Sequence, residues 1–279
     1  MGSYTYDQYV TALGSATGYF MYDSYCLVNK DTWYGSSDNY IDKYWFSNLN
    51  TVATLGRDNN FTSGITMQST ALTPTGGNGL FANTYQRRQI LSDADIGFQV
   101  YTALAYGFKE LSYFTYSDHP SGTSAGVVLD TSMVGTDTTT KNAAYYGVKN
   151  THAEIKDLEA ALVNYNWLGT IELNLEDSDD KTSTYTAANN DRLASVSNAS
   201  GALVIGCMKD VDGYDGYMVA NASEPSKSST SSVTLTFNNA TKALVYVNGV
   251  AQEVTLTNGA YTVSVADGEG VFIIPILEG

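Results

Sequence analysis

The sequence predicts an α/β domain over residues 1–168, followed by an antiparallel β-sandwich over residues 169–279. Three observations lead to this expectation. Strand-like and helix-like segments alternate along the first part, which is typical of parallel sheets with crossover helices. Helical patterns then stop near residue 169, and short strands separated by Gly-containing turns take over. The length of 279 residues also fits two domains of roughly 150 residues each.

The first part contains four helix-like and three strand-like segments. Ser92 suits a helix N-cap, and Asp93 and Asp95 in the first turn favour the positive end of the helix dipole. The compact apolar runs between the helices are typical of buried strands. Helices are expected over residues 6–13, 39–55, 92–107 and 142–165, and strands over 19–22, 64–67 and 111–116.

The second part contains six strand-like runs joined by turn dipeptides. Asp-Gly and Asn-Gly pairs are typical of tight hairpins. They occur as Asp212-Gly213, Asn248-Gly249, Asn258-Gly259 and Asp267-Gly268. The strands are expected over residues 203–208, 217–221, 233–237, 243–247, 261–265 and 271–276. We expect the boundary between the two parts within residues 169–190, where the chain is acidic from Glu172 to Asp180.

Composition excludes several classes of partner. A formal net charge of −15 and a pI near 4.3 repel phosphate backbones and anionic lipids, so we expect neither nucleic acid nor a membrane as a partner. Cys26 and Cys207 are too far apart for a metal-ligand motif. With no Gly-rich phosphate loop either, we expect no metal and no cofactor. The 22 tyrosines suit sugar faces, or equally a half-buried surface.

Several motifs resemble a known family. Residues 96–107, which end in Leu104-Ala105-Tyr106-Gly107, lead into the run Tyr113-Phe114-Thr115-Tyr116. This order resembles the helix ending in "LAYGAKG" and the final strand "YFTYW" of bacterial (β/α)8-barrel glycoside hydrolases related to the family 42 β-galactosidases. Similar matches are Tyr22–Tyr25 to "YDHYP", Tyr145–Asn150 to "YYAVKEVN", and Gly268–Val271 to "GEGV".

The resemblance implies a partial TIM-type (β/α) barrel, namely its later half, followed by the β-sandwich. A closed eight-stranded barrel takes about 250 residues, more than residues 1–168 provide. Three or four parallel strands would leave exposed edges. We therefore expect a homo-oligomer or a partner chain to complete the barrel, or irregular segments to cap an edge.

The resemblance also implies candidate catalytic positions. A retaining glycosidase needs two carboxylates about 5–5.5 Å apart. The family's nucleophile is the glutamate of a "MEST" segment, and Met67-Gln68-Ser69-Thr70 places Gln68 there, without an ionisable oxygen. Whether this glutamine is natural or a replacement stays open. No acid/base glutamate is found, so Asp23 and Asp118, which follow predicted strands, could substitute. Alternatively, Asp23 hydrogen-bonds loop backbone or substrate hydroxyls, and Asp118 caps a turn before Pro120.

Aromatic side chains near the expected strand ends could stack on sugar rings. Together with one histidine, the candidate substrate-binding residues are Tyr22, Tyr25, Trp33, Tyr34, Tyr113, Tyr116 and His119. Core packing is an equal alternative for Trp33 and Tyr34.

Two functions follow from these features. The first is a glycoside hydrolase that acts on or binds a β-linked poly- or oligosaccharide. The alternative is a non-catalytic carbohydrate-binding protein derived from a glycosidase. The acidic, Ser/Thr/Asn-rich composition fits a secreted or cell-surface bacterial protein, and this chain contains no recognisable signal segment.

Overall fold

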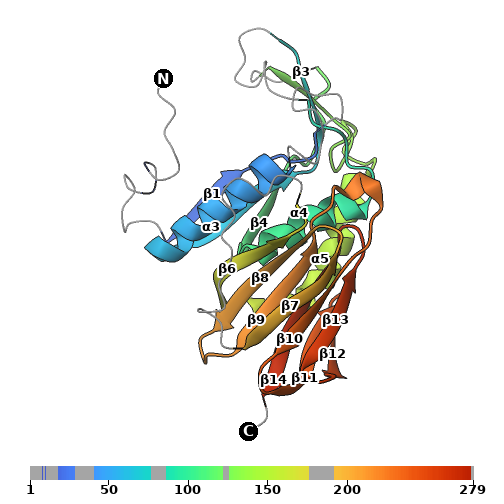
Figure 1. The fold of residues 1–279 in the computed structure, drawn as a ribbon. Coiled ribbons are helices and arrows are strands. Elements are labelled where there is room, and N and C mark those ends of the chain that lie inside the picture. The colour runs from blue at the N-terminus through green and yellow to red at the C-terminus, as the bar shows by residue number, and fades with distance from the viewer. Residues whose placement is uncertain are drawn as a thin grey trace.

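The computed structural model describes residues 8, 10, 18–28, 41–76, 86–121, 126–175 and 192–277. Within these residues the architecture is mixed α/β: a small parallel sheet with its helices lies beside two antiparallel sheets (Figure 1). No helix in these ranges combines the length and the hydropathy needed to span a membrane.

The three predicted strands of the first part form one parallel sheet in the order β1-β2-β4. The alternation of helices and strands is therefore confirmed. Of the first expected helix, only Gln8 and Val10 lie in the described residues, and both are helical. The elements are β1 (Tyr19–Asp23), η2 (Ile41–Phe46, a π-helix), α3 (Ser47–Asn59), β2 (Thr62–Gln68), α4 (Asp93–Ala105), β4 (Glu110–Phe114) and α5 (Ala143–Leu162).

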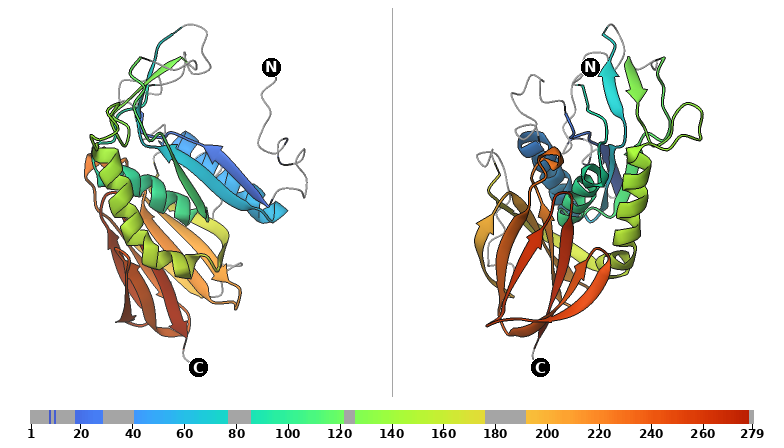
Figure 2. Two further views of the ribbon diagram at one scale, coloured as in Figure 1. Left: turned by 180° about the vertical axis from the view of Figure 1, so that it is seen from behind. Right: turned by 90° about the vertical axis from the view of Figure 1, so that its right-hand side faces the viewer.

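A separate two-stranded sheet was not predicted. Strands β3 (Ala71–Pro74) and β5 (Val127–Asp130) pair antiparallel, and they project from the end of the molecule opposite the antiparallel sheets (Figure 2). Each strand has four residues, and their partners are distant in sequence, so neither shows a recognisable alternation of its own. The pair forms a small apolar cluster of Leu72, Val127 and Leu129.

The second part contains two antiparallel sheets whose facing residues share one apolar cluster. One sheet has the order β12-β11-β14-β9-β8-β6 and the other β13-β10-β7. All six predicted strands are present, whereas β6, β7 and β12 were missed. The bounds are β6 (Tyr165–Leu173), β7 (Leu193–Ser200), β8 (Leu203–Asp210), β9 (Asp215–Asn221), β10 (Ser231–Phe237), β11 (Ala240–Val247), β12 (Val250–Thr255), β13 (Ala260–Val265) and β14 (Gly270–Leu277), with a 3-10 turn η4 (Pro225–Lys227).

Turn chemistry explains the hairpin between β11 and β12. Asn248 and Gly249 have φ values of 48° and 75°, and a two-residue hairpin of type I′ requires positive φ at both positions.

Strand β6 begins at Tyr165 and pairs with β8 through Leu173. The expected division between residues 168 and 169 thus lies inside this strand.

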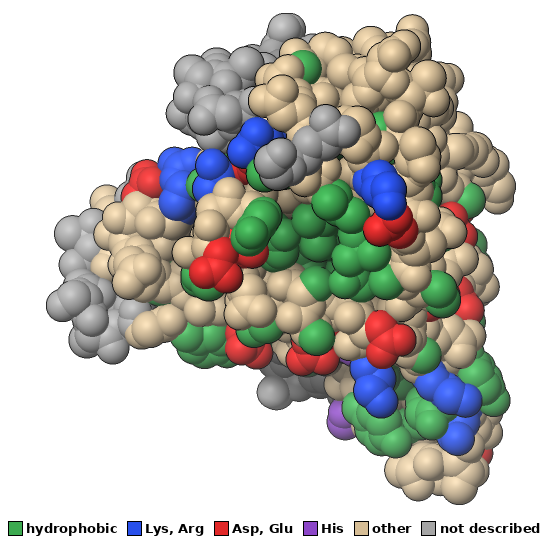
Figure 3. All heavy atoms as spheres, turned by 90° about the horizontal axis from the view of Figure 1, so that it is seen from below, with side chains coloured by type: hydrophobic (Ala, Val, Ile, Leu, Met, Phe, Trp, Pro, Cys, Tyr) green, Lys and Arg blue, Asp and Glu red, His purple; other side chains and the backbone are tan. Residues whose placement is uncertain are grey.

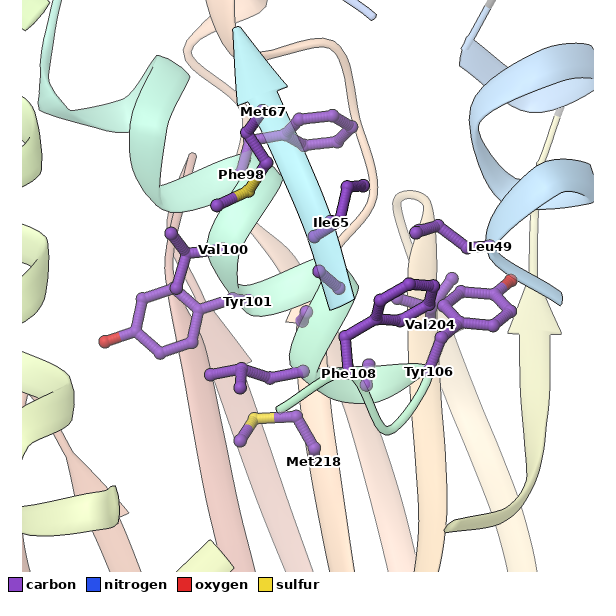
Figure 4. Packing of buried hydrophobic residues seen from close by; sticks show 14 of the residues in the cluster. Leu49, Ile65, Met67, Phe98, Val100, Tyr101, Tyr106, Phe108, Val204 and Met218 are labelled. Atoms are coloured by element: carbon purple, nitrogen blue, oxygen red, sulfur yellow. The ribbon is translucent and has the colours of Figure 1, made fainter. Parts of the chain in front are cut away.

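The six-stranded sheet is covered on both faces. Leu203, Ile205 and Cys207 of β8 face the three-stranded sheet, while Val204 and Met208 join the core around α4. Figure 4 shows Val204 and Met218 of the sheet close to Phe108 and Tyr106, which follow α4. A strand covered on both faces needs a continuous apolar run rather than an alternating one, as Leu203–Met208 provides.

A charged cluster links the loop before α4 to the second part. The Arg88 guanidinium donates to Asp95 at 2.8 and 2.6 Å and to Glu224 at 2.8 Å. Asp267 lies near this group, and its buried Oδ1 has no hydrogen-bond partner among the described residues. Burial, reinforced by Asp95 and Glu224 and only partly offset by Arg88, raises the pKa of Asp267 to about 7.

We expect Asp267→Asn to stabilise the protein more strongly at high pH than at low pH. The folded state holds the Asp267 proton up to about pH 7, whereas an unfolded Asp loses it near pH 3.9. The wild-type carboxyl therefore costs stability progressively as the pH rises through this window, and the cost levels off above it.

Melting temperatures measured at about pH 4 and about pH 8 would check this expectation. Asp212→Asn is the matched control, because Asp212 also precedes a turn glycine but is exposed. An equal gain at both pH values for Asp267→Asn would contradict the shifted pKa.

Candidate functional site

The carboxyl ends of the three parallel strands meet at one edge of their sheet. The register pairs Asp23 with Thr66 and Gln68 with Phe114, so the residues that end β1, β2 and β4 are neighbours. In sheets of this kind, ligands bind at the carboxyl ends of the strands. This edge is therefore the candidate site.

Gln68 lies at this edge, but its side chain is enclosed. It is 0% exposed, and its Oε1 accepts a hydrogen bond from the Leu27 amide at 3.0 Å. Its Nε2 donates to the carbonyl oxygens of Arg88 and Thr70 at 2.7 and 3.1 Å. A carboxamide is suited to this position because the site needs a donor and an acceptor at once.

Gln99 of α4 fixes the backbone of the same residue. The Gln68 amide donates to Gln99 Oε1 at 2.9 Å, and Gln99 Nε2 donates back to the Gln68 carbonyl at 3.0 Å. Gln68 thus joins the segment after β1, the end of β2 and the loop at Arg88. Gln68 was a candidate catalytic position, and the structure shows its side chain enclosed and hydrogen bonded within the protein.

Asp23 and Tyr25 form the polar part of the edge. Asp23 is exposed, and the Tyr25 hydroxyl donates to its carboxylate at 3.1 Å. The Tyr25 ring stacks on Phe114, with ring centroids 5.7 Å apart and planes inclined by 27°. Burial, and then the nearby Asp23 carboxylate, raise the pKa of the Tyr25 hydroxyl above its usual range, so it stays a donor.

Asp118 has the structural role that the sequence left open as an alternative. Its Oδ1 accepts a hydrogen bond from the Ser132 amide at 2.7 Å, which ties the loop after β4 to the segment after β5. Next to it, His119 is exposed and Tyr116 is 59% exposed. The Tyr116 ring is therefore open to solvent, two residues after Phe114 in the sequence.

Tyr22 and Tyr113 were expected to bind substrate, and the structure places them elsewhere. Tyr22 is 6% exposed, with its ring 5.9 Å from that of Phe108. Tyr113 bonds to His152 of α5, with 2.8 Å between Oη and Nε2. Both pair with residues on the helix-covered face of β2, Ile65 and Met67. The two-residue alternation of a strand directs them away from Asp23. Trp33 and Tyr34 lie outside the described residues.

The opposite face of the parallel sheet carries small polar groups that the sequence analysis did not single out. The hydroxyls of Thr66 and Ser112 are 2.7 Å apart, and Ser112 also contacts Met21 Sδ at 3.8 Å. The helices α3 and α4 cover the other face, where Ile65 and Met67 point toward Phe98 and Leu49 (Figure 4). Thr66 and Ser112 lie on the same face of the sheet as Asp23. Following the alternation of side chains across the strands from Asp23 would therefore have identified these two hydroxyls from the sequence.

The carboxylates of the described edge do not assemble into a metal site. No group of three or more His, Cys, Asp or Glu side chains able to hold a metal ion occurs in the described part of the chain. Glu110 lies at the amino end of β4, at the opposite end from Phe114.

No protein-family model and no curated protein matches the sequence. Solved structures with some similarity include a GH30 endoxylanase from Clostridium papyrosolvens C71, with 12% identity and a TM-score of 0.34 over 81% of this chain. Another is Xyn30A from Clostridium acetobutylicum, a xylanase of glycoside hydrolase family 30 subfamily 8, with 10% identity and a TM-score of 0.28 over 79% of this chain.

The chain spans 46% and 44% of the lengths of these two proteins. Both are xylanases of glycoside hydrolase family 30, whereas the motifs resembled the family 42 β-galactosidases.

We expect Gln68→Glu to lower the free energy of unfolding by about 2–4 kcal/mol, because a carboxylate oxygen would replace the group that donates to two buried carbonyls. Gln252→Glu, at an exposed position on β12, is the matched control. Urea denaturation measures both.

The competing interpretation makes the opposite prediction. If Gln68 occupies the position of a missing nucleophile, Gln68→Glu should stay folded and gain hydrolysis of an aryl β-glycoside. That result would overturn the structural role assigned here.

Proposed function

We propose that this chain is a carbohydrate-binding protein of glycoside hydrolase type, and that the carboxyl edge of its parallel sheet binds a β-linked poly- or oligosaccharide. The observation that supports this most directly is the Tyr25–Phe114 ring pair, whose hydroxyl is hydrogen bonded to the exposed carboxylate of Asp23.

The chemistry of this edge suits a neutral, flat and polar ligand. Aromatic faces contact the C–H groups of a sugar ring, while carboxylate and hydroxyl groups bond to sugar hydroxyls. Tyr116, at 59% exposure, adds an open aromatic surface. The net charge of −15 disfavours an anionic ligand, which leaves uncharged glycans as the better fit.

Binding without cleavage by this chain alone is the better-supported version. Hydrolysis with retention needs a carboxylate pair. Gln68 has no ionisable oxygen and is fully enclosed, and Asp118 holds a backbone amide. Of the three candidate catalytic residues, Asp23 is the exposed one.

A glycoside hydrolase is the second candidate. It is favoured by one observation, the exposed Asp23 carboxylate oriented by Tyr25. In that version another polypeptide would supply the second carboxylate and complete the barrel. For either function we propose a secreted or cell-surface bacterial protein, on the basis of composition.

We expect Tyr116→Ala to weaken glycan binding roughly two- to twelvefold, since one aromatic contact contributes about 0.5–1.5 kcal/mol. Tyr214→Ala is the control, because Tyr214 is 52% exposed in the β8–β9 turn of the antiparallel part. Isothermal titration against xylan-, galactan- and glucan-derived β-linked oligosaccharides measures the affinities.

Failure of the wild-type protein to bind any member of this panel would contradict the proposal. Hydrolysis of an aryl β-glycoside by the wild type, abolished by Asp23→Asn, would favour the hydrolase instead.

A further inference from the structure

Three polar side chains form a row across the parallel sheet, on the face opposite α3 and α4. The register pairs Asp23 with Thr66 and Thr66 with Ser112, so one residue comes from each strand. Neighbouring strands lie about 5 Å apart, and residues paired across them point to the same face. Asp23 is exposed, whereas Thr66 and Ser112 are half-buried. This polar row of Asp23, Thr66 and Ser112 therefore reaches solvent, two residues before the ends of β2 and β4.

The polar row adjoins the stacked ring pair on the same face. Phe114 follows Ser112 by two residues on β4, so the two side chains point the same way and lie roughly 6.6 Å apart along the strand. The Tyr25 ring stacks on Phe114, and its hydroxyl donates to Asp23 at 3.1 Å. Asp23 thus belongs to both groups. A flat ligand that contacts these rings would extend over the polar row.

The hydrogen bonds within the row leave acceptors for a ligand. The hydroxyls of Thr66 and Ser112 are 2.7 Å apart, and Ser112 also donates to Met21 Sδ at 3.8 Å. A hydroxyl has one proton and two lone pairs, and a carboxylate only accepts. With the Ser112 proton on Met21, Thr66 donates to Ser112, and both oxygens keep a lone pair. The row therefore suits a ligand that donates hydrogen bonds.

We propose that Asp23, Thr66 and Ser112 bind the hydroxyl groups of the oligosaccharide, which lies across the strands and donates its hydroxyl protons to the row. This inference rests on the proposed function and deepens it, because it assigns two further binding residues and a direction to the ligand. Neutral sugars with free hydroxyls match the row. A ligand carboxylate offers no proton and would meet the like charge of Asp23.

Two other surfaces combine apolar with charged groups. A hollow of about 520 Å³ beside the amino end of β4 is lined by apolar residues that include Leu104 and Met208, and by charged residues that include Lys109, Glu110 and Lys156. Seen from below, the molecule gathers hydrophobic side chains with acidic and basic side chains around them (Figure 3). The polar row instead places neutral hydroxyls next to stacked rings, which is the better match for a neutral sugar.

Removing single hydroxyls tests the row. Thr66→Val keeps the branched shape of the side chain and should weaken oligosaccharide binding about two- to twelvefold, the effect of one hydrogen bond. Ser112→Ala should have a similar effect. Thr234→Val is the matched control, because half-buried Thr234 makes the same kind of cross-strand bond, to Thr262 at 2.9 Å, in the antiparallel part. Isothermal titration with the tightest-binding β-linked oligosaccharide measures the affinities, and melting temperatures verify folding.

Oxidation of Met21 supplies a second readout, for which the wild type suffices. Met21 is half-buried and contacts Ser112, so a ligand on the polar row should shield its sulfur from peroxide, which converts methionine to the sulfoxide. Peptide mass mapping is expected to show slower oxidation of Met21 when the oligosaccharide is bound. At the same oligosaccharide concentration, Thr66→Val should reduce this protection and Thr234→Val should preserve it.

The outcomes separate this inference from the proposed function. Absence of glycan binding by the wild type would contradict the proposed function and the polar row together. Glycan binding whose affinity is unchanged in Thr66→Val and Ser112→Ala would overturn the polar row alone. Glycan binding that leaves the oxidation of Met21 unchanged would overturn it as well, and the ring pair would then remain as the site.

Discussion

Helix α4 packs against strand β8 with no room for a side chain between them. A Cβ atom on Gly206 would lie 2.0 Å from the Ala105 carbonyl oxygen, and one on Gly97 would lie 2.1 Å from that of Gly268. Every residue of α4 from Asp95 to Ala105 is buried. The helix has the parallel sheet on one side and the six-stranded sheet on the other. Since interiors are packed to crystal-like density, this one contact fixes how the two parts of the chain lie together.

Helix α4 also holds the segments of the candidate site in position. A fully buried helix can carry a polar side chain only where a partner satisfies it, and the polar residues of α4 meet this condition at the carboxyl edge. Gln99 bonds to both backbone groups of Gln68, and Asp95 binds Arg88 and the Leu91 amide. The loops that present Tyr25 and Asp23 therefore start from segments that α4 holds in place.

The sequence was informative where the determining interactions are local. Apolar runs and turn dipeptides predicted all three parallel strands and six of the antiparallel ones, and the position of Asp23 and Tyr25 at a strand end followed from them. It was uninformative where the partner is distant. The bonds of Gln68 reach Leu27, Arg88 and Gln99, and strands β3 and β5 pair across more than fifty residues of chain. Tyr22 and Tyr113, which were candidate substrate-binding residues, lie on the helix-covered face because side chains alternate along each strand.

The enclosure of Gln68 limits which groups at the carboxyl end of the parallel sheet can contact a ligand. In parallel α/β folds the carboxyl ends of the strands carry ligand chemistry, whereas the amino ends contribute to stability and packing. Gln68 anchors the carboxyl end from inside, so the groups left to contact a ligand there are Asp23 at the end of β1 and the loop residues Tyr25 and Tyr116. A hollow of about 520 Å³, lined by charged as well as apolar side chains, lies at the other end, beside Glu110 and Leu111.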